Sequence, residues 1–159
     1  LLGSAEVTFG FCLLMVAYSL VRFKWLAILG WLMIVPASLA EVFGKLVLFH
    51  PSPPVFMHRT LVSTHLPSFY VHTDFSYPSG HMTRTIFIIT VLLCLLVFQS
   101  KNYLLKLIGI PFLLTTAFLM GLTRVYLGEH WTSDVIGGSL LGMAVAFFTA
   151  VLILRVKKV

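Results

Sequence analysis

The chain of 159 residues is too apolar for a soluble domain, because 59% of its residues are hydrophobic and only 10% are charged, whereas about a quarter are charged in an ordinary soluble domain. Its net charge of +6 does not indicate nucleic-acid binding, because the positive residues stand between apolar runs and form no basic patch with interleaved aromatic residues. The composition therefore predicts one integral membrane domain over residues 1–159, with the lipid bilayer and not nucleic acid as its surroundings.

Five apolar runs are each long enough for a helix that crosses the hydrocarbon core, which is about 30 Å thick and needs roughly 20 residues. The predicted fold is an all-α bundle of five transmembrane helices. Because the chain opens directly in apolar sequence without a basic leader, we expect no signal peptide and at least one further helix upstream of Leu1. The runs cover residues 4–21, 25–49, 81–99, 103–123 and 132–154.

Charged residues divide between the two ends of these predicted helices. One end holds seven positive residues and no acid, and the positive-inside rule places it in the cytoplasm. The other end, with the loop of residues 50–80, then faces outward and holds every acid and every histidine. The first group is Arg22, Lys24, Lys101, Lys106, Arg155, Lys157 and Lys158; the second is Glu6, Glu41, Asp74, Glu129 and Asp134, with Lys45, Arg59, Arg84, Arg124, His50, His58, His65, His72, His81 and His130.

Glu41 and Lys45 are spaced i,i+4 at the outer end of the second run, where an unpaired charge would cost several kcal/mol. They form a structural ion pair, a functional pair, or both. Arg84, one turn beyond His81, has two open interpretations: it contacts phosphate, or it is the buried partner of an acid such as Asp74 or Glu41.

Ser79 precedes the third run and has the side chain typical of a helix N-cap. The third and fifth predicted helices both enter the membrane from the outer side, so the amides at their N-termini point outward and can converge on one anion. His81 and His130 stand at these two helix ends. On the local pattern alone, a capping serine with a chance neighbouring histidine is the commoner explanation.

His130 and Asp134 lie four residues apart, so a helix that begins near Trp131 places them on one face. An aspartate on one ring nitrogen fixes the histidine tautomer and leaves the other nitrogen free to act as a nucleophile. The fork of Arg124 matches phosphate oxygens two at a time. An equal alternative is an interfacial salt-bridge cluster of Arg124, Glu129 and Asp134, with His130 as a satisfied polar residue.

Small residues form a stripe on the fifth predicted helix. Such a stripe lets two helices approach closely, so we expect tight packing there and assign it no chemistry. Its members are Gly137, Gly138, Ser139 and Gly142.

These motifs together resemble the type 2 phosphatidic acid phosphatase superfamily of membrane lipid phosphatases. The resemblance spans residues 41–138 and is carried by Pro78-Ser79-Gly80-His81, then Arg124, His130 and Asp134 at the family spacing. It implies a helical membrane core usually built from six spans, no metal or other cofactor, and a covalent phosphohistidine intermediate. Carried over by motif position, His130 is the nucleophile, Asp134 its orienting carboxylate and His81 the general acid, while Ser79, Gly80, Arg124 and Lys45 hold phosphate.

The first motif of the family departs from its usual form here. A lysine, six residues, then arginine and proline are expected, but the six residues after Lys45 lead to Ser52 and Pro53. Either Arg59 reaches back to the site, or the site has one guanidinium fewer. This departure leaves the substrate class less certain than the reaction type.

The function predicted is hydrolysis of a lipid phosphomonoester or prenyl diphosphate in the bacterial plasma membrane, with the site facing outward and a bell-shaped pH profile from two histidines of opposite protonation. Undecaprenyl diphosphate, phosphatidylglycerophosphate and lipid A phosphates are all compatible substrates. Two other classes stay open. One is a catalytically inactive relative that binds or transports lipid phosphate, and the other is a zinc hydrolase, although no HExxH or close ligand spacing is present.

Overall fold

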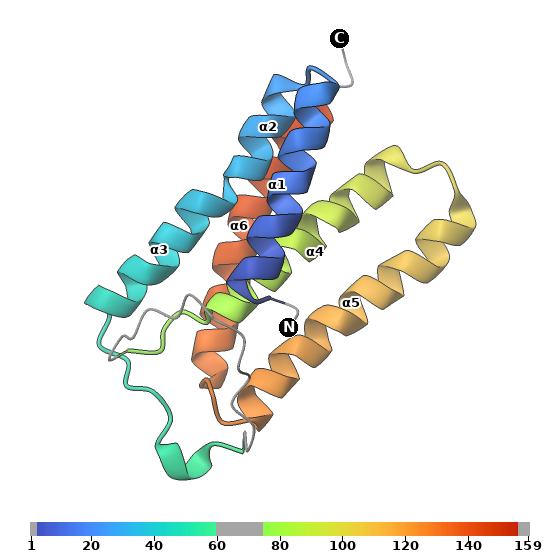
Figure 1. Ribbon diagram of the computed structural model, residues 1–159. Coiled ribbons are helices and arrows are strands. Elements are labelled where there is room, and N and C mark those ends of the chain that lie inside the picture. Colours follow the sequence, from blue (N-terminus) through green and yellow to red (C-terminus); the bar gives the residue numbers. More distant parts are fainter. Residues whose placement is uncertain (1–2, 60–74, 156–159) are drawn as a thin grey trace.

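The computed structural model describes residues 3–59 and 75–155, and these residues form a helical bundle without β-strands (Figure 1). The predicted all-α class is confirmed. The helices are α1 (Ala5–Val21), α2 (Trp25–Leu32), α3 (Ile34–Val47), the short 3-10 helix η1 (Val55–Met57), α4 (Gly80–Gln99), α5 (Tyr103–Tyr126) and α6 (Thr132–Arg155).

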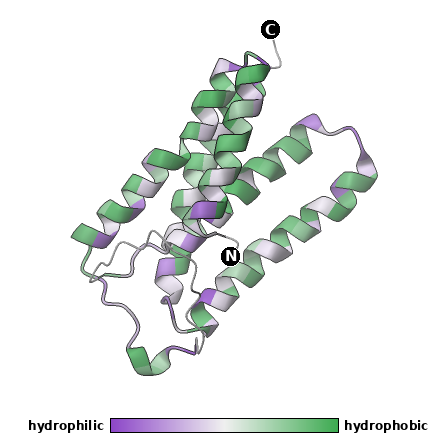
Figure 2. Cartoon of the chain, viewed as in Figure 1, coloured by the Kyte–Doolittle hydropathy of each residue, from purple (hydrophilic) through white to green (hydrophobic). Residues whose placement is uncertain are grey.

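Four helical segments of the described residues are long and apolar enough to cross a membrane: Trp25–Val47, which joins α2 and α3, and the helices α4, α5 and α6. The helix α1 covers the first predicted span, but with 17 residues it is shorter than the others. Apolar residues make up most of each helix (Figure 2), and many of the large ones are exposed, as expected for a polytopic membrane bundle.

The second predicted span, over residues 25–49, is present as Trp25–Val47, but its helix is interrupted at Met33. The helix α2 ends at Leu32, Met33 N–H bonds to Gly30 O in a tighter turn, and α3 then runs from Ile34. Pro36 explains the break, because it has no N–H to donate to Leu32 O four residues earlier and its ring crowds that carbonyl.

The helices α4 and α6 lie against each other along the middle of the bundle. A Cβ on Gly138 would overlap with the carbonyl oxygen of Ser79, and one on Gly142 with that of Thr83. Glycine at these positions lets the two backbones touch, so the predicted close packing is confirmed. Ser139 is not part of this contact, because its hydroxyl bonds to Val135 O within α6.

Apolar side chains from α1, α2, α3, α4 and α6 fill the space between these helices. The helix α5 stands at the edge of the bundle beside α4, and Gly121 is its one buried residue. The outer position of α5 leaves its contact with α6 short (Figure 1). The core cluster consists of Cys12, Trp31, Ile34, Phe87, Val91 and Ala146.

One end of the bundle gathers the N-termini of α4 and α6 with the C-termini of α3 and α5 (Figure 1). The first two are joined by a hydrogen bond from Ser79 N–H to Asp134 O, 3.0 Å long, so the predicted convergence of two helix N-termini is observed. Of the predicted loop 50–80, the described residues are irregular apart from η1 and the start of α4. His65, His72 and Asp74 lie outside the described residues.

Candidate active site

His130 and Asp134 meet at the start of α6. The Nδ1 atom of His130 lies 3.3 Å from Oδ2 of Asp134, and the backbone N–H of Trp131 donates to the same oxygen over 3.0 Å. Asp134 is fully buried, whereas the His130 side chain is 13% exposed. The carboxylate therefore holds one ring nitrogen and leaves Nε2 of His130 as its free nitrogen.

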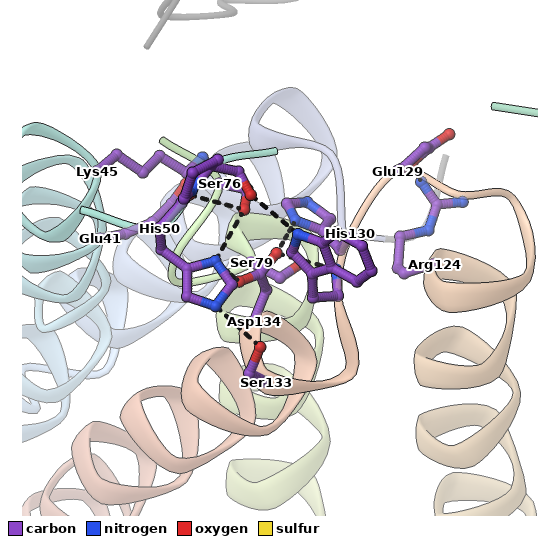
Figure 3. A network of polar contacts seen from close by, with 12 residues as sticks. Glu41, Lys45, His50, Ser76, Ser79, Arg124, Glu129, His130, Ser133 and Asp134 are labelled. Atoms are coloured by element: carbon purple, nitrogen blue, oxygen red, sulfur yellow. Dashed lines mark hydrogen bonds and ion pairs between the residues drawn. The ribbon is translucent and has the colours of Figure 1, made fainter. Parts of the chain in front are cut away.

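A second imidazole, that of His50, approaches the same carboxylate (Figure 3). Its Nδ1 atom lies 3.2 Å from Oδ1 of Asp134, and its Nε2 atom lies 3.1 Å from the hydroxyl oxygen of Ser133. Sequence reasoning counted His50 only among the outward histidines. No spacing links it to Asp134, which is 84 positions further along the chain, so no sequence signal indicated this contact.

His81 and His130 line one cavity of about 220 Å³, together with Lys45, Ser52, Gly80 and other residues of α1, α3 and α4. The two histidines thus come from the starts of α4 and α6 and face the same space. We call this space the histidine cavity.

Glu41 holds two cations at the wall of the histidine cavity. Its buried carboxylate accepts hydrogen bonds from Lys45 Nζ at 2.8 Å and from Arg84 at 2.7 Å, and Arg84 Nε also donates to Gly3 O at 2.9 Å. Of the two interpretations of Arg84, its role as the partner of Glu41 is the one observed. Lys45 and Arg84 leave one net positive charge after Glu41 is counted.

Arg124 pairs with Glu129 across the turn between α5 and α6. Gly128 has a φ of +72° in this turn, which a glycine adopts at no steric cost. The alternative cluster of Arg124, Glu129 and Asp134 is only partly present, because the Asp134 side chain contacts imidazoles instead. The Nε atom of Arg124 is buried and has no partner in the described residues.

Ser79 stands at the N-cap position of α4 but makes no side-chain capping bond, contrary to the simple capping interpretation. Its hydroxyl is fully buried and has no partner in the described part of the chain. Gly80 follows it directly under the Glu41 carboxylate, with which a Cβ at this position would overlap.

Arg59 does not reach the cavity that Lys45 and Ser52 line. Its guanidinium carbon lies 4.6 Å from the ring centroid of Tyr126, and the backbone N–H of Arg59 donates to Leu127 O. It lines a neighbouring cavity of about 600 Å³, the arginine cavity, which also contains His130. Arg84 is therefore the guanidinium that accompanies Lys45 in the histidine cavity.

Within residues 3–59 and 75–155, no three His, Cys, Asp or Glu side chains are arranged to hold a metal ion. Cys12 and Cys94 are free thiols.

Comparison with known sequences decides the family. The sequence profile of the PAP2 superfamily matches residues 25–158. The chain belongs to the PAP2 superfamily. The predicted resemblance to the type 2 phosphatidic acid phosphatases is thereby confirmed.

Two proteins of named activity are similar to this chain in sequence. An undecaprenyl-diphosphatase of Sulfolobus acidocaldarius is 32% identical over 133 residues, which cover 82% of this chain and 58% of the relative. A phosphatidylglycerophosphatase B of Bacillus subtilis is 37% identical over 79 residues, or 47% of this chain and 37% of the relative. This PAP2 chain thus spans little more than half the length of the first relative and less of the second.

The fold is also that of a solved member. The crystal structure of a transmembrane PAP2-type phosphatidylglycerolphosphate phosphatase from Bacillus subtilis superposes with a TM-score of 0.67 at 23% identity, over 99% of this chain and 74% of the other. This PAP2 chain therefore has the transmembrane helical fold of that enzyme.

Proposed function

We propose that this protein is an integral membrane phosphatase that hydrolyses a lipid phosphomonoester or prenyl diphosphate through a phosphohistidine intermediate, without a metal ion. The observation that carries the proposal is the shared cavity of His130 and His81, walled by Lys45 and Arg84 and backed by Asp134. Phosphoryl transfer depends on a positioned nucleophile and on fixed positive charge around the phosphoryl group, and an imidazole can serve as that nucleophile.

In the first step, the free Nε2 of His130 attacks phosphorus. The bond from phosphorus to the lipid oxygen breaks, its electron pair stays on that oxygen, and His81 supplies the proton. Water then attacks phosphorus in the phosphohistidine, and His81 takes up a proton of that water. The bond from phosphorus to Nε2 breaks, its electron pair returns to His130, and inorganic phosphate leaves. Proton transfer by a positioned group such as His81 accelerates a step by about 10² to 10⁴.

Charge on the transferring phosphoryl group would be offset by the groups around the histidine cavity. Lys45 and Arg84 are cations of its wall, and the N-termini of α4 and α6 add amide dipoles. Ser79 and Arg124 are not among the residues that line the histidine cavity, although each is next in sequence to, or paired with, a residue that does. Their buried Oγ and Nε atoms are donors without an acceptor, which supports their assignment as phosphate contacts. Arg59 lines the arginine cavity with His130 and not the histidine cavity.

The lipid chain would lie in an apolar groove of about 450 Å³ that side chains of α4, α5 and α6 line. Val125 and Thr132 line both this groove and the arginine cavity, so the groove continues to His130. A lipid substrate can therefore keep its chain at the bilayer while its phosphate reaches the imidazoles. We call the apolar groove between α4, α5 and α6 the tail groove.

The names of the two relatives support a prenyl diphosphate or phosphatidylglycerophosphate as substrate. The inactive relative that only binds lipid phosphate is the second candidate, and the observation that favours it is the serine at position 52. The ion pair of Arg124 with Glu129 is a second observation in favour of the inactive relative, because this guanidinium can bind phosphate only after the Glu129 carboxylate is displaced.

The test is release of inorganic phosphate by the purified full-length protein in detergent micelles. The substrates are undecaprenyl diphosphate, phosphatidylglycerophosphate, phosphatidic acid and lipid A phosphates, each with and without an excess of chelator. Release from at least one lipid at an unchanged rate in chelator supports the proposal. Binding without release from any of them supports the inactive relative, and activity that chelator abolishes and zinc restores supports the metal hydrolase.

A further inference from the structure

His50 connects the loop after α3 to the start of α6. Besides its contacts with Asp134 and Ser133, its ring lies 5.7 Å from that of Tyr77, and Ser76 Oγ lies 3.4 Å from its Nδ1 atom. The next residue, Pro51, accepts a hydrogen bond from Trp131 Nε1 at 2.9 Å. Several independent contacts thus hold this imidazole beside the carboxylate.

Asp134 needs donors because it is fully buried, and a buried carboxylate without them is costly. Its Oδ2 atom has two, from Trp131 and His130. Its Oδ1 atom has the His50 ring at ion-pair distance, without the alignment of a regular hydrogen bond. The side chain of Ser76, which also contacts His50, hydrogen-bonds to the same carboxylate. Removing His50 would therefore leave one oxygen of the carboxylate without its neighbouring imidazole, and the plane of the carboxylate less restrained.

His50 does not line the histidine cavity. It opens instead onto a neighbouring cleft, with Pro51, Ser52, Trp131 and Ser133 among its lining residues, of which Ser52 also lines the histidine cavity. The imidazole is therefore not among the groups that face the space where phosphate would bind. Its contact with the Asp134 carboxylate is its most direct connection to His130.

We propose that His50 is a positioning residue that fixes the Asp134 carboxylate and, through it, the orientation of His130. The proposal rests on the proposed function of His130 as nucleophile. In this arrangement the buried carboxylate of Asp134 contacts both imidazoles, His50 through Oδ1 and His130 through Oδ2. Residues that orient the ligands of a metal in this way change activity by about 10- to 100-fold when they are replaced, and we expect an effect of the same order here.

The test compares three variants of His50 on the lipid phosphate that the wild-type protein hydrolyses fastest. His50→Ala should lower kcat about 10- to 100-fold with little change in KM, because His50 does not face the substrate. His50→Asn places an amide N–H where Nδ1–H stands and should recover much of the loss. His50→Gln, whose amide matches Nε2 instead, should not. Ser133→Ala is the control that removes only the distal contact, and it should stay close to wild type.

The second part of the test places His50→Ala in an Asp134→Asn background. If His50 acts through the carboxylate, His50→Ala should not lower kcat further in the Asp134→Asn background, because the effects of coupled residues are not additive. The proposal would be overturned by an equal fall in kcat in all three His50 variants, by a change in KM alone, or by full additivity of His50→Ala with Asp134→Asn. A wild-type protein that hydrolyses none of the lipids would instead refute the proposed function. Thermal unfolding of each variant shows that the comparison is made between folded proteins.

Discussion

At the scale of single residues, Glu41 sets the charge of the histidine cavity. It neutralises one of the two cations that it binds, Lys45 and Arg84. Glu41→Gln keeps the shape of the side chain but removes its charge, so the cavity gains one positive charge and inorganic phosphate should inhibit more strongly.

We expect the inhibition constant for phosphate to fall at least about 5-fold, because one unit charge about 4 Å away contributes about 1 kcal/mol even at the dielectric constant of water. The melting temperature should also fall, because breaking a buried ion pair is destabilising. Measurement of inhibition constants for both proteins checks the first effect. Val42→Ala, a half-buried neighbour without charge, is the control. Weaker inhibition in Glu41→Gln would show that Glu41 does not act through charge.

At this scale the sequence predicted the contact between His130 and Asp134 but not all the other contacts of the site. His130 and Asp134 were found because helical spacing couples them, and the structure places them within 3.3 Å. His50 was missed, because its contact with Asp134 depends on how a proline-rich loop folds back over α6. The pairing of Arg124 with Glu129 was foreseen only within an alternative cluster that also included Asp134.

At the scale of elements, α5 determines whether a lipid chain can lie beside the site. Ser139 on α6 faces the tail groove, so Ser139→Leu should fill part of it. Hydrolysis of a long-chain lipid phosphate should then fall on the order of tenfold, the usual effect of a few methylene groups in an apolar pocket. A short-chain, water-soluble phosphate ester should be hydrolysed at the wild-type rate.

Ser139→Ala removes the same hydroxyl without filling the groove, and it is the matched control for this experiment. Parallel kinetics on the two substrates with all three proteins gives the answer. Equal losses on long and short substrates would show that the groove does not hold the chain, and that the substitution acts by distorting α6.

The helices themselves could be predicted closely, because runs of about 20 apolar residues have few alternatives. The expected ranges 81–99 and 132–154 correspond to Gly80–Gln99 and Thr132–Arg155. The break between α2 and α3 was not predicted, because Pro36 lies within a run that is otherwise continuously apolar. The tail groove could not be predicted either, because it depends on how far α5 stands from α6.

At the scale of the whole molecule, the two ends of the bundle differ in charge. We propose that the end with the histidine cavity faces outward, because Arg22, Lys24, Lys101 and Arg155 lie at or near the opposite end. Single cysteines test this in a background where Cys12 and Cys94 are replaced by alanine. Val55→Cys in η1 should react with a membrane-impermeant maleimide on intact cells, whereas Ser100→Cys, between α4 and α5, should react only after permeabilisation.

Both positions are solvent-accessible parts of connections and not of helices that cross the membrane, so either can be labelled once it is reachable. Phosphatase activity of each variant shows that the labelled protein is native. The reverse pattern of labelling would place the histidine cavity on the cytoplasmic side.

The most informative single measurement follows the phosphoryl group itself. Purified protein is mixed with a lipid substrate that carries labelled phosphate, quenched within milliseconds in denaturant at alkaline pH, and assayed for label on the polypeptide and in free phosphate. We expect wild-type protein to carry the label on His130, and His130→Ala to carry none while its turnover falls about 10³-fold or more. If folded His130→Ala releases phosphate at the wild-type rate, His130 is not the nucleophile.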